Sequence, residues 1–435
     1  MSNIKMIFRA LRYRNFRLFF VGQGISLVGT WMQQIAMGWL VYRLTGSALM
    51  LGVVGFAGQI PTFLLSPLAG VMADRWNRQR ILIIIQILAM IQAFILAVLV
   101  LRGTIAVWHI VTLGVFLGCV SAFDIPTRQS FLIEMVEDKG NLGNAIALNS
   151  LMFNSARLIG PSIAGLVILL AGEGVCFLIN SVSFLAVIVS LIMMNIKHLG
   201  SHKKNDNVLI ELKEGFVYVK NSLPIKLILM LLSIVSLMGA SYTVLMPIFA
   251  KDILGGGPST FGFLMASAGV GAILATVYLA SRKNVLGFGK IIVIASSLFA
   301  AGLIMFSISR VLWLSLLLLA MCGFGFMAHT AASNSILQTI VDDDKRGRVM
   351  SFYTMAFMGM SPIGSLVSGA LAKIIGPETT LVIGGLICLI ASLVFAINIP
   401  ALRKAIHPIY RRIGIIPEVA SGVSSALNLT VPPRD

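Results

Sequence analysis

Twelve long apolar runs constrain the fold of this 435-residue chain more than any other feature of its sequence. Each has roughly the 18–25 residues that a helix needs to cross the hydrocarbon core of a bilayer. The runs cover residues 16–41, 49–72, 80–101, 105–123, 145–170, 174–195, 225–250, 259–280, 288–309, 311–333, 350–374 and 379–400. Only 11% of the residues are charged, against roughly 25% in an ordinary soluble domain. We therefore predict an all-α membrane protein with twelve transmembrane helices.

The start of the chain and its cysteines fit the same class. Five basic residues between Lys5 and Arg17 lead into the first apolar run, with no small-residue cleavage site before it. We expect no cleaved signal peptide, so the first span should remain in the protein. The four cysteines lie in or at the edge of apolar runs, where we expect them to pack without forming disulfides or a metal site. They are Cys119, Cys176, Cys322 and Cys388.

The distribution of basic residues predicts how the chain crosses the membrane. The formal net charge is +17, from 33 Lys and Arg residues against 16 Asp and Glu. Five basic residues lie in loops on one side, Arg157 lies inside a span, and the rest lie on the side of both termini. Because loops rich in Lys and Arg stay in the cytoplasm, both termini should be cytoplasmic, and we expect no nucleic-acid partner. The cytoplasmic loops would then contain Arg78, Arg128, Lys203, Arg282 and Arg346.

A long charged connection divides the spans into two sets of six. Within residues 197–224, apolar residues recur at helical spacing opposite charged ones, which is typical of an interfacial helix. They are Leu209, Leu212, Phe216 and Val219. We expect an N-terminal bundle at 1–196, this connection, a C-terminal bundle at 225–400 and a partly disordered cytoplasmic tail at 401–435.

The two sets of spans also resemble each other in sequence. Residues 130–138 align with 335–343, and the segment from Gly160 to Gly165 aligns with the one from Gly364 to Gly369. Internal duplication of six spans is typical of transporters whose substrate site lies between the halves. The same alignment places His329 opposite Asp124. We expect His329 to have a structural partner in a neighbouring loop, although a proton-carrying role remains open.

Two motifs resemble those of a known superfamily. A short charged loop between two spans matches the Gly-x-x-x-Asp-Arg-x-x-Arg signature of the major facilitator superfamily at Gly70, Asp74, Arg75 and Arg78. The fifth span carries Gly160, Pro161, Ala164 and Gly165, which resemble the antiporter signature of that superfamily. With the segment from Asp124 to Arg128, these motifs resemble the branch that contains the enterobactin exporter and the macrolide efflux proteins.

The resemblance implies roles for the charged residues of these motifs. In the superfamily, the loop and an acid of the fourth span form a gate on the cytoplasmic side. That role would fall here to Asp74, Arg78, Asp124 and Arg128, with Gly70 and Arg75 completing the loop. The resemblance also implies two six-helix halves and no cofactor.

Polar residues inside the spans are candidates for the substrate cavity. The first span carries Gln23, Thr30 and either Gln33 or Gln34 on one stripe, which could line a cavity or form interhelical hydrogen bonds. In the fifth span, Asn154 and Arg157 share a face. Arg157 is either a cationic centre for a substrate or an arginine tied to helix carbonyls and nearby amides. The first span has no carboxylate, which favours a neutral or anionic substrate over a lipophilic cation.

These observations favour a transporter over an enzyme or a receptor. The sequence lacks a phosphate-binding Gly-x-x-x-x-Gly-Lys-Ser/Thr loop and a His-Glu-x-x-His zinc motif, so we expect no enzyme activity and no metal. We expect a monomeric, proton-coupled antiporter of a bacterial inner membrane that exports a siderophore-like or macrolide-like compound by alternating access. An importer or a lysophospholipid flippase of the same fold is the alternative, because a fold does not set direction.

Overall fold

The computed structural model describes residues 9–136, 141–196, 208–240, 242–282 and 285–412. Within these ranges the side chains of residues 67–68, 70–75, 208–213, 240, 343–344 and 412 lie outside the description. The described chain consists of helices joined by short connections.

The first set of helices follows the apolar runs closely. A 3₁₀ turn, η1 (Arg9–Arg12), precedes the first span. The spans are α2 (Arg14–Thr45), α3 (Ala48–Arg75), α4 (Arg78–Leu101), α5 (Val107–Glu134), α6 (Leu142–Ala171) and α7 (Glu173–Ile192). We call α2–α7 the N-terminal bundle. Glycines with positive φ end two of these helices, because Gly46 and Gly172 adopt φ of 57° and 82° where other residues would be strained.

The second set contains short π-helical turns inside two of its spans. Residues 223–253 form one span from α9 (Leu223–Ile234), η3 (Val235–Ala240), α10 (Tyr242–Ile248) and η4 (Phe249–Ile253). Residues 345–375 form another from α14 (Asp343–Thr354), η5 (Met355–Gly359) and α15 (Met360–Ile375). The rest are α8 (Val208–Asn221), α11 (Pro258–Ala280), α12 (Phe288–Ile308), α13 (Leu312–Ile340), α16 (Pro377–Ile397) and α17 (Ile399–Arg412). We call α9–α16 the C-terminal bundle.

Eleven helical segments of the described chain are long and apolar enough to cross a membrane. The helix α2 is not among them, although its 32 residues would reach about 48 Å at 1.5 Å per residue. Its polar stripe lowers its mean hydropathy, and contacts with α6 and α7 place it inside the N-terminal bundle. It is therefore the twelfth span, and neighbouring helices cover part of its polar stripe, including Gln23, Ser26 and Gln33.

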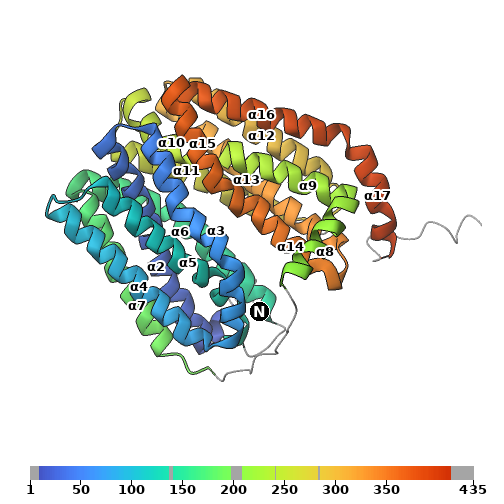
Figure 1. Ribbon diagram of the computed structural model, residues 1–435, viewed down its shortest axis with the longest axis horizontal. Coiled ribbons are helices and arrows are strands. Elements are labelled where there is room, and N and C mark those ends of the chain that lie inside the picture. The colour runs from blue at the N-terminus through green and yellow to red at the C-terminus, as the bar shows by residue number, and fades with distance from the viewer. Residues whose placement is uncertain (1–8, 137–140, 197–207, 241, 283–284, 413–435) are drawn as a thin grey trace, which may run out of the picture.

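The two bundles contact each other mainly through two pairs of helices, α3 with α15 and α6 with α11. Figure 1 shows α15 and α10 beside α3. Glycines allow these approaches: a Cβ on Gly52 would lie 2.6 Å from the Ser365 carbonyl oxygen, and one on Gly165 would lie 2.9 Å from the Cα of Ser259. We call the end of the molecule that carries Arg9, the α3–α4 connection and α17 the basic face. The named glycine contacts lie toward the other end, which we call the opposite face.

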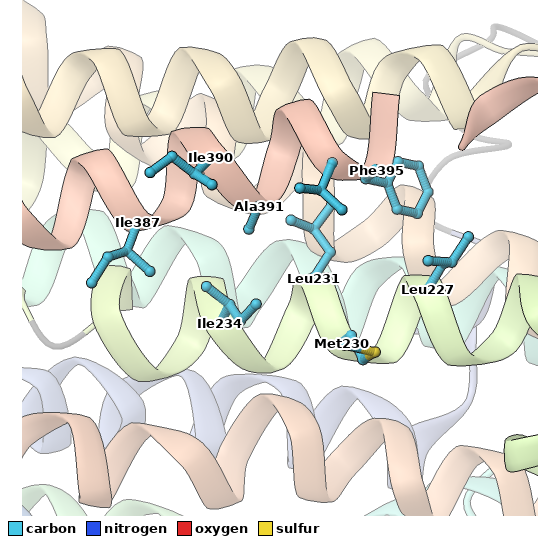
Figure 2. A pocket seen from close by; sticks show the side chains of 9 residues that line it. Leu227, Met230, Leu231, Ile234, Ile387, Ile390, Ala391 and Phe395 are labelled. Carbon is cyan, nitrogen blue, oxygen red and sulfur yellow. The ribbon is translucent and has the colours of Figure 1, made fainter. Parts of the chain in front are cut away.

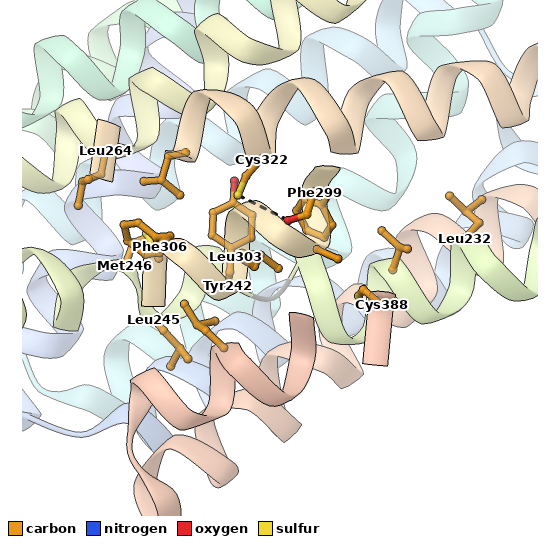
Figure 3. Close-up of a cluster of buried hydrophobic side chains, with 14 of the residues drawn as sticks. Leu232, Tyr242, Leu245, Met246, Leu264, Phe299, Leu303, Phe306, Cys322 and Cys388 are labelled. Atoms are coloured by element: carbon orange, nitrogen blue, oxygen red, sulfur yellow. Dashed lines mark hydrogen bonds between the residues drawn. The ribbon is translucent and has the colours of Figure 1, made fainter. Parts of the chain in front are cut away.

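A tightly packed apolar cluster holds the C-terminal bundle together (Figure 3). Tyr242 and Phe299 meet edge to face with ring centroids 6.2 Å apart, and Phe249 and Phe306 lie 4.8 Å apart. The thiol of Cys322 points at the Phe299 carbonyl oxygen, 3.8 Å away. All four cysteines are free, and Cys176, Cys322 and Cys388 are buried.

The connection between the bundles contains α8, which is tied to the C-terminal bundle. Glu214 forms an ion pair with Arg348 of α14 at 2.5 Å, and the ring of Phe216 lies 6.4 Å from that of Phe352. Of the four apolar residues predicted for an interfacial helix, Leu209 and Leu212 lie outside the described side chains. Phe216 is 57% exposed, so the helix keeps an apolar residue at the surface.

The tail expected beyond residue 400 begins with a helix that the sequence analysis did not predict. Residues 399–412 form the helix α17. Leu402, Ile406 and Tyr410 recur every four residues and are all buried, so one face of the helix packs on the bundle. The sequence analysis overlooked this spacing because the segment is strongly basic. Residues 413–435 lie outside the described part.

Membrane topology is testable at exposed arginines on both faces. With the four native cysteines replaced, single cysteines at Arg80 and Arg282 should resist an impermeant maleimide in intact cells, because the positive-inside rule retains the basic face in the cytoplasm. Cysteines at Arg102 and Arg310, on the opposite face, should be labelled. Permeabilised cells provide the control for reactivity. Labelling at Arg282 in intact cells would invert the assignment.

Candidate functional site

Two separate groups of charged residues on the basic face include an acid of α5. The Arg128 guanidinium lies 3.3 Å from the Asp124 carboxylate one turn earlier, and the Gln86 amide donates to the same carboxylate at 3.3 Å. Arg78 instead pairs with Glu134 at the end of α5. The side chains of Gly70, Asp74 and Arg75 lie outside the described residues, so the structure does not show how they join these groups.

Glu134 is the acid that sequence reasoning missed. Its side chain is 4% exposed. Arg78 reaches it from the first turn of α4, which the Asn77 side chain caps by accepting a hydrogen bond from the Arg80 amide at 3.0 Å. The internal repeat could have pointed to Glu134, because this residue aligns with Thr339. The first half thus has a carboxylate where the second half has a neutral residue.

The polar stripe of α2 serves two purposes. The Gln33 amide donates to Gln92 at 2.9 Å and accepts from Asn180 at 2.8 Å, which joins α2 to α4 and α7. Thr30 and Gln34 are exposed. Gln33 therefore forms interhelical hydrogen bonds. Thr30 and Gln34 are instead accessible to solvent or to a solute. The side chain of Gln23 is only 4% exposed, so it belongs to the interior of the bundle.

Arg157 projects from α6 without an acidic partner among the described residues. Its guanidinium lies over the Trp31 ring of α2, 5.7 Å from the centroid. The neighbouring Asn154 amide donates to the Ser150 carbonyl of its own helix at 2.9 Å. Among the described residues, the Arg157 guanidinium therefore contacts the Trp31 ring and forms no hydrogen bond to an amide or a helix carbonyl.

A line of aromatic and guanidinium groups connects Arg157 to the basic face. Trp31 meets Phe153 edge to face with centroids 6.4 Å apart, and the Arg128 guanidinium lies 5.6 Å from the Phe153 ring. Guanidinium groups favour the faces of aromatic rings. We call this series of contacts the cation–aromatic line; it consists of Arg157, Trp31, Phe153 and Arg128. It joins the centre of α6 to the ion pair of Arg128 with Asp124.

The residues of the antiporter-like motif bring helices close together around Arg157. A Cβ on Gly160 would lie 2.5 Å from the Trp31 Cβ, so only glycine lets α2 approach α6 at that level. Gly165 lies against Ser259, and the Pro161 carbonyl lies against Gly262 of α11. Gly269 of α11 lies against the carbonyl oxygen of Arg157 and against Leu158. Arg157 thus lies where the two bundles meet.

A second contact between the bundles lies at the opposite face. The Tyr42 hydroxyl at the end of α2 donates to the Asp252 carboxylate of η4. The ammonium group of Lys251 lies 5.6 Å from the centroid of the Tyr42 ring, and Trp39 stacks on Phe261 with centroids 6.4 Å apart. We call Tyr42, Lys251 and Asp252 the opposite-face latch. Sequence reasoning did not single it out.

His329 lies deep in the C-terminal bundle, so the expectation that it has a partner in a neighbouring loop is wrong. It is fully buried in α13, and neither ring nitrogen has a hydrogen-bond partner among the described residues. The Ser333 hydroxyl one turn later is also buried without a partner in that part of the chain. The helix turns this residue into the interior of the bundle.

An apolar groove of about 260 Å³ lies on the outside of the C-terminal bundle. Its side chains come from α9 and α16, among them Leu227, Met230, Ile387 and Ile390 (Figure 2). A solute site needs a few polar groups that fix orientation, and this groove has none. We therefore exclude it as the substrate site. Within the described residues, no cluster of three or more His, Cys, Asp or Glu side chains could hold a metal ion.

Comparison with known proteins assigns the chain to a family of transporters. The family described as transmembrane secretion effectors matches residues 6–411. The staphyloferrin A transporter of Staphylococcus aureus is 27% identical, with 87% of this chain and 95% of that protein covered. The multidrug efflux pump Tap of Mycolicibacterium fortuitum is 25% identical (88% and 93% covered), and macrolide efflux protein A of Streptococcus pyogenes is 21% identical (87% and 96% covered).

Solved structures show the same fold. A bacterial homolog of the human lysosomal transporter Spinster, inward-facing and unoccupied, superposes with a TM-score of 0.70 at 14% identity, covering 90% of this chain and 98% of that one. A POT family transporter in complex with 5-aminolevulinic acid gives 0.71 at 12% identity, covering 89% and 96%. These comparisons confirm the predicted twelve-helix fold and place the chain among transporters and not among enzymes. The chain belongs to the transmembrane secretion effector family of the major facilitator superfamily.

Proposed function

We propose that the protein is a proton-coupled antiporter that exports a small neutral or anionic compound, of the siderophore or macrolide kind, by alternating access. The observation that carries this proposal is Arg157, which lies at the junction of the two bundles and has no acidic partner in the described part of the chain. An arginine inside a span costs about 2.5–3.5 kcal/mol on insertion scales, so an unpaired one indicates a function.

The surroundings of Arg157 support a substrate that carries carboxylate or carbonyl oxygens. Its guanidinium presents a planar fork of donors that matches a carboxylate, while Trp31 supports its face. Thr30 and Gln34 are exposed neutral groups on α2, the helix that carries Trp31. The family relatives support the same class of cargo, since one is named for a siderophore and two for drug or macrolide efflux.

The contacts between the bundles support a state that is closed at the opposite face. There the glycine contacts and the opposite-face latch join the bundles, whereas Asp124 and Glu134 pair within the N-terminal bundle and Glu214 pairs with Arg348. In our proposal, residues 1–196 and 225–400 move as two bodies joined by 197–224. On closure of the basic face, Gly70, Asp74 and Arg75 complete the gate with Arg78, Asp124 and Arg128.

We further propose that the protein acts as a monomer in a bacterial inner membrane, with both termini cytoplasmic. The proton would be exchanged along a gradient, because no nucleotide-binding loop is present in the sequence. The density of basic residues on the face of the termini supports this orientation.

Transport by reconstituted protein tests the proposal. In inside-out vesicles, an imposed proton gradient should drive uptake of a labelled siderophore or macrolide, and a protonophore should abolish that uptake. Vesicles without the protein set the background. Uptake that ignores the gradient would contradict antiport, and movement of lysophospholipid alone would show that the protein is a flippase.

A further inference from the structure

A basic pocket lies on the outer rim of the C-terminal bundle, away from the junction of the bundles. It has a volume of about 420 Å³ and lies between the start of α12 and the helix α17. Its lining residues are Lys290, Ile399, Pro400, Arg403, Lys404 and His407. None of these residues takes part in the proposed transport site.

The register of α17 explains how the pocket forms. Leu402, Ile406 and Tyr410 are buried and fix one face of the helix against the bundle. Arg403 and Lys404 lie on the neighbouring face, together with His407 one turn later. A Cβ on Gly289 would lie 3.4 Å from Leu402, so α17 lies next to the start of α12, where Lys290 projects. Two helices distant in sequence therefore bring three permanent cations to one pocket.

No carboxylate among the lining residues neutralises the charges around this pocket. Lys290, Arg403 and Lys404 are exposed, and none forms an ion pair within the described chain. Like charges held around one space repel each other, and an anion with several oxygens relieves that repulsion while accepting charge-assisted hydrogen bonds.

The position of the pocket indicates where that anion comes from. The span α16 ends at Ile397 and α17 begins two residues later, so the pocket lies at the edge of the hydrocarbon layer. Ile397 is 78% exposed and Val394 is 51% exposed, which leaves an apolar surface of α16 beside the pocket for an acyl chain. Ile399 and Pro400 give the pocket an apolar wall. A soluble phosphate would use the cations but not this apolar surface.

We propose that this pocket binds the phosphate headgroup of an anionic phospholipid, with an acyl chain lying along the end of α16. Basic pockets on the cytoplasmic side of membrane proteins are suited to such headgroups. Three cations exceed the charge of a single phosphodiester, so a lipid with two phosphates, such as cardiolipin, should bind more tightly than phosphatidylglycerol.

Lipid binding by the purified full-length chain tests this proposal without a transport assay. Native mass spectrometry would measure retention of cardiolipin and phosphatidylglycerol, with phosphatidylcholine as the neutral reference. The test variant combines Lys290→Gln, Arg403→Gln and Lys404→Gln. The matched control combines Arg12→Gln, Arg14→Gln and Arg17→Gln, which removes the same charge from the basic face of the other bundle. We expect the test variant to lose apparent affinity for cardiolipin by about a hundredfold, and the control to change little.

Thermal melting in phosphatidylcholine nanodiscs shows whether the variants fold. If the triple variant does not fold, the single Lys290→Gln variant takes its place. Adding cardiolipin should raise the melting temperature of the wild type and the control but not of the test variant. Equal retention of cardiolipin by test and control variants would overturn the proposal. Equal stabilisation by inorganic phosphate or glycerol phosphate would also overturn it, because the ligand would then be a soluble anion.

Discussion

Replacing Arg157 with alanine is expected to abolish measurable transport while the protein still folds and inserts. The guanidinium has no acidic partner among the described residues, so its removal leaves no buried carboxylate uncompensated. A hydrogen bond to a charged group contributes about 1.5–3 kcal/mol, so apparent substrate affinity should fall about 10- to 150-fold. Arg157→Lys should have an intermediate effect, because lysine keeps the charge but loses the fork and the stacking on Trp31.

Affinity and thermal stability measured on the same purified variants separate binding from structure. Arg80→Ala provides a control, because Arg80 is an exposed arginine outside the cation–aromatic line. If Arg157 were only structural, the alanine variant would melt at a lower temperature and bind substrate normally. Unaltered affinity in Arg157→Ala would therefore remove the central support of the proposed function.

Removing the opposite-face latch should shift the protein toward a state that is open at that face. Tyr42→Phe deletes the only hydroxyl that donates to Asp252 among the described side chains, and Asp252→Asn weakens the same bond. Loss of a hydrogen bond to a carboxylate, at about 1.5–3 kcal/mol, would change the ratio of the two states about 10- to 150-fold. A shift of this size would raise a state populated at about 1% to about 10–60%.

Spin labels at Leu44 and Trp313 can report this shift, since both positions are exposed near the opposite face, one in each bundle. Double electron–electron resonance should show a longer distance gaining population in Tyr42→Phe and Asp252→Asn. Tyr278→Phe is a suitable control, because the Tyr278 hydroxyl accepts from Arg282 within the C-terminal bundle. Unchanged distance distributions in both latch variants would show that the contact does not bias the equilibrium.

The spans could be predicted from the sequence because hydropathy is a local property. Side-chain partners could not, since they depend on which helices lie together. Asp252 is 210 positions from Tyr42 along the chain. Arg78 pairs with Glu134, rather than with Asp124, because of how α4 packs against α5. Gln33 and Gln34 differ by one position yet point to different surroundings, and only the helix contacts show which of them is buried.

One error and one omission also have physical causes. His329 was assigned from its alignment with Asp124, but repeat position does not specify whether a helix turns a residue toward a loop or into the bundle. The helix α17 was overlooked because its basic composition was taken to indicate disorder. Such a composition indicates disorder only when no apolar face accompanies it. Three buried residues at four-residue spacing gave α17 such a face.

The hydrogen-bonded amides of α2 have a consequence for how the protein is made. Gln33 is satisfied by Gln92 of α4 and Asn180 of α7, which are synthesised 59 and 147 residues later. Until those helices arrive, α2 would expose an unpaired amide to lipid, and its own hydropathy does not mark it as a stable span. The amide of Gln33 therefore gains both of its partners only after α7 has been made, so α2 takes its final place in the N-terminal bundle later than its position in the chain suggests.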